Sequence, residues 1–299
     1  MTPNIETFIA CDAAYEAAKT VLFGAPFDST TSFRPGARFG SSAIRHESFG
    51  LETYSPYQDK DLADIRVFDC GDLELCFGSA EAALRDIEEK AGEILADGKL
   101  PFLIGGEHLV TLGAVRAAVR KYPDLHIIHF DAHADLRDDY LGAQLSHACV
   151  MRRCHELTGD GRIHQFCIRS GEKAEFTFAA AHTDMHKFSF DGLKELAGKL
   201  AAENTPVYLT VDLDCLDPSL FCGTGTPEAG GVRFTELLDA ILKVSKTNIV
   251  GADVNELAPM LDASGASTAA ACTWSVSPSP CSSMRSTGNS GAWWMRYIG

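Results

Sequence analysis

Aspartate and histidine residues that directly follow apolar runs are the feature that most constrains the fold of this 299-residue chain. They occur in three segments, HFDAHAD, TVDLD and GGEH, and the residues concerned are His108, Asp131, His133, Asp135, Asp212 and Asp214. The runs 125–130 and 207–211 are rich in β-branched and aromatic residues, which predicts buried strands. The fold must therefore place several polar strand ends together.

The spacing within these segments indicates how the side chains meet. Alternate residues of an extended chain share a face, so we expect Asp212 and Asp214 to project together, and Asp131, His133 and Asp135 likewise as their strand ends. Carboxyl ends of parallel strands border the crevice where ligands bind. A single aspartate after a strand is ordinarily a helix cap, but capping requires neither the repetition nor the histidines. The pattern predicts a metal site.

The ligand types indicate which metal binds and how many ions. Four carboxylates and two imidazoles, without a thiolate, form an oxygen-rich set that suits Mn²⁺ better than a structural zinc ion. Four crowded carboxylates would repel one another and take up protons unless cations neutralised them. Two ions about 3.5–4 Å apart would share a water whose pKa falls from about 15.7 towards roughly 7. We therefore expect two Mn²⁺ and a water nucleophile.

These residues lie in long, ordered motifs that resemble the ureohydrolases of the arginase and agmatinase family, and bacterial agmatinases most of all. The resemblance runs from about residue 21 to residue 272, through FGAPFDSTTSFRPGARFGSSAIR, GGEHLVTLG, HFDAHADLRDDY, LSHAC, VDLDCLDP, GTGTPEAGG and DVNELAP. It implies one Mn²⁺ bound by His108, Asp131, Asp135 and Asp212. It implies a second bound by Asp131, His133, Asp212 and Asp214, so that Asp131 and Asp212 bridge the ions.

The resemblance also assigns roles to residues that are unremarkable alone. His147 in LSHAC would otherwise be a surface or structural histidine, but it matches the family's proton-shuttling, substrate-contacting histidine. Glu256 in DVNELAP would otherwise cap a turn, but it matches the carboxylate that pairs with the substrate guanidinium. Thr226 in GTGTP matches a position that supports the guanidinium or its carboxylate partner. We interpret Glu107 and Asp253 as structural.

The family implies hydrolysis of a guanidino compound to urea and an amine. Asp135 would orient the attacking hydroxide, and His147 would pass a proton to the departing amine. Agmatine, which gives putrescine and urea, is the expected substrate because LRDDYLGAQ lacks the Asn- and Ser-containing pattern with which arginases hold an α-carboxylate. Within this segment, Asp138 and Asp139 are either attractors of the far ammonium or solvated loop charges. The alternatives are guanidinobutyrase, guanidinopropionase, arginase, or a non-catalytic metal-binding homologue.

Composition restricts the partners and the compartment. The net charge of −15 argues against a nucleic-acid partner and favours a cationic small molecule. Ten cysteines without a CxxC pair, and a first segment, MTPNIETF, without a basic or apolar leader, predict a cytoplasmic protein. No run approaches the roughly 18–20 apolar residues that span a bilayer. The resemblance implies a homo-oligomer, a trimer or a hexamer.

Strand and helix patterns alternate, which predicts an α/β fold with parallel crossovers. The expected strands are residues 21–27, 65–69, 101–104, 125–130, 163–169, 186–190, 207–211 and 249–254, and the clearest helix is 79–98. The family adds a three-layer α/β/α sandwich on an eight-stranded, mainly parallel sheet. We expect one catalytic domain over 1–272. The tail 273–299 is rich in Ser and Pro and carries every tryptophan, which we interpret as a frame change or a divergent end.

Overall fold

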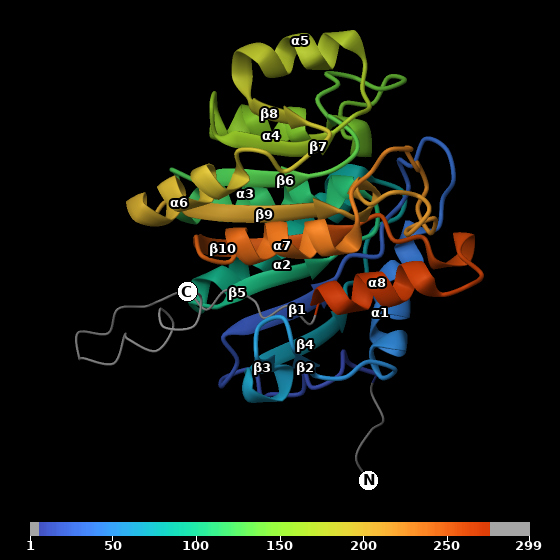
Figure 1. Ribbon diagram of the computed structural model, residues 1–299, viewed down its shortest axis with the longest axis vertical. Coiled ribbons are helices and arrows are strands. Elements are labelled where there is room, and N and C mark those ends of the chain that lie inside the picture. The colour runs from blue at the N-terminus through green and yellow to red at the C-terminus, as the bar shows by residue number, and fades with distance from the viewer. Residues whose placement is uncertain (1–5, 276–299) are drawn as a thin grey trace.

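Eight parallel strands form the central sheet of the computed structural model, which describes residues 6–275 (Figure 1). Their order across the sheet is β4, β1, β5, β10, β9, β6, β7 and β8. The strands are β1 (Thr20–Gly24), β4 (Val67–Asp72), β5 (Leu100–Ile104), β6 (His126–Phe130), β7 (Ile163–Ile168), β8 (Asp184–Lys187), β9 (Pro206–Asp212) and β10 (Asn248–Asn255). Every pair is parallel, so the expected sheet is confirmed, with strand ends shifted by a few residues.

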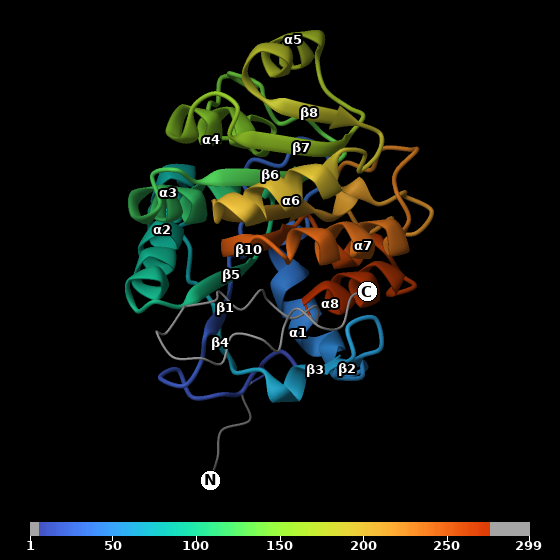
Figure 2. The same cartoon turned by 60° about the vertical axis from the view of Figure 1, so that its left-hand side comes forward.

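Helices cover both faces of this sheet (Figures 1 and 2). One face carries α2 (Ala80–Ala96), α3 (Thr111–Lys121), α4 (Val150–Thr158) and α5 (Lys173–His182). The other carries α1 (Gly40–Ser48), α6 (Leu193–Glu203), α7 (Phe234–Val244) and α8 (Ala266–Ser275). The arrangement is the three-layer α/β/α sandwich expected from the sequence.

Two apolar cores lie on either side of the sheet. In β1, Val21 and Phe23 face the layer of α2 and α3, whereas Leu22 faces the layer of α1. A strand buried on both faces needs apolar residues at consecutive positions, which explains why these strands are continuous apolar runs in the sequence. The predicted helix over 79–98 is α2, and the Ser79 hydroxyl accepts the Ala82 N–H at 3.2 Å as an N-cap.

Smaller elements complete the described part of the chain. Strands β2 (Tyr54–Ser55) and β3 (Lys60–Asp61) form a separate antiparallel pair. Helix α8 continues to Ser275, three residues past the last residue of the expected catalytic domain, and the rest of the predicted tail lies outside the described residues. Within residues 6–275, no helix combines the length and the apolar character that crossing a membrane requires.

The four central strands end side by side. Residues at or next to their ends are in register, with Ile104 of β5 beside Val254 of β10, Val254 beside Val211 of β9, and Val211 beside Phe130 of β6. The segments that leave these strands therefore start from one edge of the sheet. All three ligand segments, together with Glu256, follow these four strands.

Two glycines allow the segment after β5 to pass between its neighbours. The Gly105 N–H donates to the Val254 carbonyl at 2.7 Å, and the Gly106 carbonyl accepts the Glu256 N–H at 2.9 Å. A Cβ atom on Gly106 would lie 2.0 Å from the Phe27 carbonyl oxygen. No side chain fits there unless the backbone moves, so the glycine sets the approach of His108 to the site.

We expect Gly106→Ala to destabilise the fold by about 2 kcal/mol or more, because the added methyl overpacks against a rigid backbone atom. Gly92→Ala is the control, because a Cβ atom there meets nothing within 4 Å and Gly92 lies inside α2. That control should be neutral or stabilising by about 1 kcal/mol. Urea denaturation of both variants measures the difference, and equal stabilities would contradict the packing argument.

Candidate metal centre

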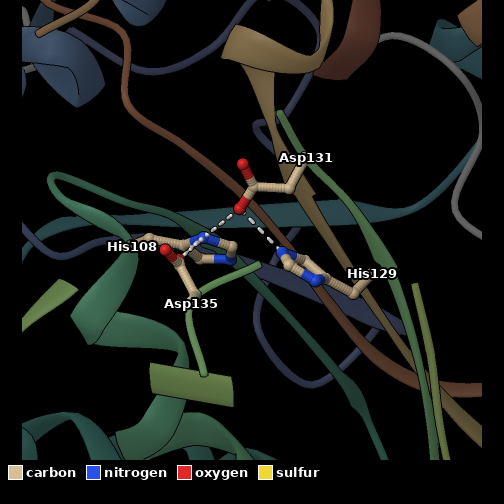
Figure 3. Close-up of side chains that lie close together, drawn as sticks. All are labelled: His108, His129, Asp131 and Asp135. Carbon is tan, nitrogen blue, oxygen red and sulfur yellow. Dashed lines mark hydrogen bonds and ion pairs between the residues drawn. The ribbon is translucent and has the colours of Figure 1, made fainter. Parts of the chain in front are cut away.

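His108 and the carboxylates of Asp131, Asp135 and Asp212 converge on one point at the edge of the sheet. Figure 3 shows His108 with two of them, Asp131 and Asp135. The Nδ1 atom of His108 lies 3.0 Å from Asp131 Oδ2, 3.1 Å from Asp135 Oδ2 and 3.4 Å from Asp212 Oδ2. All four side chains are buried. His108 Nδ1 makes no hydrogen bond to a described residue. A bare nitrogen facing three carboxylate oxygens is the arrangement expected around a cation.

A second group of ligand atoms lies beside the first. His133 Nδ1 is 2.9 Å from Asp214 Oδ2 and 3.5 Å from Asp131 Oδ1. The buried Asp214 Oδ2 also lacks a hydrogen-bond partner among the described residues. Asp131 belongs to both groups because one of its oxygens faces His108 and the other faces His133. The two groups thus share one carboxylate.

The six predicted ligands converge by a different backbone path from the one expected. Asp135 has φ of 52°, in the left-handed region, so it does not continue an extended strand. Asp212 ends β9, and its Oδ1 accepts the N–H of Asp214 at 2.8 Å, which caps the short 3₁₀ helix Leu213–Cys215. The extended backbone predicted up to Asp135 and from Asp212 to Asp214 is therefore wrong, and turns bring these carboxylates together instead.

His129 joins the first group as a hydrogen-bond donor. His129 is not among the residues predicted for the site, yet its Nε2 lies 2.7 Å from Asp131 Oδ2. The Gln165 amide nitrogen, 3.0 Å from His129 Nδ1, also donates to the Ala134 carbonyl. His129 Nδ1 is therefore the acceptor and Nε2 carries the proton. Gln165 was missed because only the register of β6 with β7, which pairs it with His129, brings it here.

In His108 the nitrogen that points away from the carboxylates, Nε2, is the one that donates a proton to a fixed partner. Its Nε2 lies 2.9 Å from the hydroxyl of Thr210, and that hydroxyl donates to Asp253 Oδ1 at 2.6 Å. Asp253 also accepts from Tyr208 and Asn255, so it acts as an acceptor throughout. Because the proton of Thr210 points at Asp253, the hydroxyl oxygen accepts Nε2–H of His108. This contact leaves Nδ1 directed at the three carboxylates, so a cation that displaces its proton would find this nitrogen free to bind.

The electrostatics fit a cation as well. Burial and the neighbouring Asp131 raise the pKa of Asp135 to about 7, and burial with Asp214 and Asp131 raises that of Asp212 well above its usual value. Burial opposes a charge on His108, but the adjacent carboxylates of Asp131 and Asp135 raise its pKa well above the ordinary one. Without cations this cluster retains protons that divalent ions would displace. The donor set and its charge therefore fit divalent ions.

A cavity of about 270 Å³ opens beside the two groups. Four residues predicted for the site line it, namely His133, Asp135, His147 and Thr226. Glu256 does not line it. Glu256 is buried behind the cavity, where its Oε1 accepts the His108 N–H at 2.8 Å. Its φ of 68° is unusual for a residue with a side chain, and such outliers cluster at functional sites.

Glu107 and Thr30 hold His147 in place. The His147 N–H donates to the Thr30 hydroxyl at 3.0 Å, and Thr30 donates its own N–H to Glu107 Oε2 at 2.9 Å. Burial raises the pKa of Glu107 to about 7. Burial, followed by the charges of His133 and His108, lowers the pKa of His147 to about 4. His147 is therefore neutral near pH 7, and its Nε2 makes no hydrogen bond to the described residues.

Other residues singled out in the sequence have structural contacts. Asp138 pairs with Arg153 at 2.7 Å, and Asp139 accepts the Gly142 N–H at 2.8 Å. Neither lines the cavity. Arg34 donates to the carbonyls of Thr224 and Gly225, at 2.7 and 3.2 Å, and so holds the loop that carries Thr226.

Comparisons with known proteins agree with this geometry. The model of the Arginase family matches residues 18–277. The agmatinase of Bacillus subtilis (strain 168) is 48% identical over 262 residues, which are 86% of this chain and 89% of that protein. The N(1)-aminopropylagmatine ureohydrolase of Thermococcus kodakarensis is 41% identical over 250 residues, covering 81% and 84%. The structure of agmatine ureohydrolase of Thermoplasma volcanium matches with a TM-score of 0.83 and 33% identity, covering 91% and 93%.

We expect Thr210→Val to weaken Mn²⁺ binding by about 10–100-fold, because the isosteric side chain cannot accept Nε2–H of His108. Thr177→Val is the matched control, since Thr177 lies on the exposed side of α5 and donates to the Lys173 carbonyl. Isothermal titration of the metal-free proteins measures both affinities. Unchanged Mn²⁺ affinity in Thr210→Val would show that this hydroxyl does not set the tautomer.

Metal affinity should rise with pH. Asp135, whose pKa is raised to about 7, holds its proton at lower pH and must release it to bind a cation. If each ion displaces at least one proton, affinity should increase by about tenfold per pH unit below pH 7. Titrations with Mn²⁺ at pH 6, 7 and 8, in buffers of different ionisation enthalpy, report affinity and proton release together. An affinity independent of pH would contradict the protonated cluster.

Proposed function

This chain belongs to the arginase family, and on that premise we propose that it hydrolyses agmatine to putrescine and urea at a centre of two Mn²⁺ ions. One observation carries the proposal. Two groups of ligand atoms share Asp131, and they border a cavity that His147 also lines. Two adjoining cation sites beside a substrate-sized space suit hydrolysis by a metal-activated water.

Six residues would hold the ions. The first ion would be bound by His108, Asp131, Asp135 and Asp212, and the second by Asp131, His133, Asp212 and Asp214. The oxygen-rich set favours Mn²⁺ over softer ions. When bound, the ions would supply a water acidic enough to act as a nucleophile near neutral pH. Asp131, with one oxygen towards each group, is the best supported bridge. Asp212 directs Oδ2 at His108, and its Oδ1 accepts the Asp214 N–H, so it too would lie between the two groups.

Glu256 would bind the substrate guanidinium. A carboxylate pairs with a guanidinium through two parallel hydrogen bonds, which fixes the plane of the group and presents its central carbon for attack. The Glu256 side chain accepts the backbone N–H of His108 at 2.8 Å, so it is tied to the metal-binding segment. Thr226 lines the cavity and would support this end of the substrate.

His147 would move the proton that cleavage requires. The departing nitrogen must gain a proton as its bond to carbon breaks, and the proton released by the attacking water is available for it. A neutral imidazole whose Nε2 has no described partner can accept that proton and pass it on. The Thr30 hydroxyl holds the His147 backbone, which keeps this nitrogen at the cavity. Asp135 lines the same cavity and would orient the water.

A guanidino substrate with a second cationic end suits the charge of the chain. The net charge of −15 attracts cations and disfavours substrates with a free carboxylate. The identity of 41% to an N(1)-aminopropylagmatine ureohydrolase makes that longer polyamine derivative a second candidate. Both candidates share the guanidinium and differ only at the far end.

A urea assay across a substrate panel tests the proposal. The panel is agmatine, N(1)-aminopropylagmatine, arginine, guanidinobutyrate and guanidinopropionate, each with the Mn²⁺-loaded protein. We expect the highest kcat/KM for agmatine. A higher kcat/KM for arginine or a guanidino acid would show that this compound, and not agmatine, is the substrate. Bound Mn²⁺ with no urea from any compound would indicate a non-catalytic homologue.

Compartment and assembly complete the proposal. All nine cysteines within the described residues are free thiols, as expected in the reducing cytoplasm. Large apolar side chains such as Phe33, Phe77 and Met260 are exposed, and burial of such side chains against another subunit would be favourable. We place the protein in the cytoplasm as a homo-oligomer, a trimer or a hexamer.

We expect Glu256→Gln to retain two Mn²⁺ per subunit and to lose about a hundredfold or more in kcat/KM. The Gln carbonyl can still accept the His108 N–H, but a buried guanidinium then lacks its charge partner, at a cost of about 3 kcal/mol. Glu93→Gln, on the exposed side of α2, controls for the loss of one negative charge. Elemental analysis and kinetics report the two effects separately. Near-parental activity would remove Glu256 from the site.

A further inference from the structure

Six of the ten histidines lie outside the metal centre, and two of them, His155 and His182, lie in the last turns of helices beside the start of β7. Three polar side chains converge there. His155 is in the last turn of α4, Asp160 follows in the loop before β7, and His182 is the last residue of α5. We call these three residues the distal cluster. Nothing in the proposed reaction uses them.

The ligand atoms of the distal cluster are close together. His155 Nε2 and His182 Nδ1 each lie 2.8 Å from the same oxygen of Asp160, Oδ1. All three atoms lie within 4.8 Å of one another. Protonated histidines are favoured singly at helix C-termini, but that preference does not explain why two of them meet at one carboxylate oxygen.

The surrounding contacts hold the rings in position. The ring of Phe178 stacks on His182 with centroids 4.3 Å apart and meets His155 edge-on at 5.0 Å. The backbone fixes Asp160 as well, because the N–H groups of Gly159 and Gly161 donate to the carbonyls of His155 and His182. The site is thus organised without the cation. The Asp160 side chain remains 68% exposed, which leaves open coordination positions for water.

We propose that His155, Asp160 and His182 form a second cation site, distinct from the metal centre, that binds Zn²⁺ or a similar imidazole-preferring ion. Two imidazoles and one carboxylate with an open position match the three-ligand sets that bind zinc. The softer, nitrogen-rich ligand set separates this site from the oxygen-rich metal centre. The inference does not depend on the proposed reaction.

A cation in the distal cluster would fasten α5 to α4. Helix α5 lies at the edge of the molecule (Figure 1), where Glu175 and Ala179 are buried and Phe176 and Phe178 are only partly buried. The other ends of the two helices lie at the cavity, since α4 follows His147 and α5 follows Glu172, both of which line it. Zinc binding would therefore stiffen one wall of the cavity from its far side.

Zinc titration of the Mn²⁺-saturated protein tests the proposal. We expect the parent chain to bind one more Zn²⁺ than the His155→Asn/His182→Asn variant. Asp160→Asn, a change at an exposed side chain, should lower the affinity of that extra ion at least about tenfold, because even outer-sphere partners contribute 10–100-fold. His186→Asn is the control, since His186 bonds Asp184 outside the distal cluster and should leave the count unchanged.

Amide hydrogen exchange supplies a second measurement that is independent of stoichiometry. Zn²⁺ at constant Mn²⁺ should slow exchange in residues 173–187 of the parent and of His186→Asn, and should not do so in His155→Asn/His182→Asn. Equal zinc stoichiometry, affinity and exchange in the parent and both distal-cluster variants would overturn the proposal. Urea formation by the variants, measured with Mn²⁺ alone, separates this outcome from a failure of the proposed function.

Discussion

The buried carboxylate of Asp131 is the interaction on which the metal centre depends. An ionised carboxylate without partners costs several kcal/mol to bury. Although burial opposes its ionisation, the surrounding histidines lower the pKa of Asp131 well below its usual value. One oxygen faces His108 and His129, and the other faces His133. The charge at the centre of the site is thus compensated from both sides, and both ligand groups are arranged around it.

The parallel sheet brings the ligand-bearing segments together. Strands β5, β10, β9 and β6 end in register, so four segments that are distant in the chain meet at one edge. Local backbone features then orient the side chains. They include a left-handed residue at Asp135, a 3₁₀ turn capped by Asp212, and the close passage of Gly106 against Phe27. The fold therefore determines where the site lies, and the turns after the strands determine how its side chains are oriented.

Contacts beyond the ligands decide what each histidine does. His108 and His129 are both buried beside Asp131, yet Thr210 accepts from one and Gln165 donates to the other. As a result, His108 directs Nδ1, the nitrogen that a cation would need, at the carboxylates, whereas His129 donates the proton of Nε2 to Asp131. Proximity to a carboxylate does not by itself identify a metal ligand. The distal cluster of His155, Asp160 and His182 uses the same residue types in an exposed, nitrogen-rich setting suited to a different ion.

The sequence by itself determined the eight strands, the alternation of strands with helices, and the six residues that meet at the metal centre. Apolar runs and i, i+2 spacing are local patterns, and polar residues after buried strands have one edge at which to gather. The tertiary structure alone decided the left-handed path to Asp135, the roles of Gln165 and Thr210, the depth of Glu256, and the meeting of His155 with His182. These depend on register between strands and on which side chain supplies each proton. Such information lies in contacts between segments far apart in the chain, where no local pattern records it.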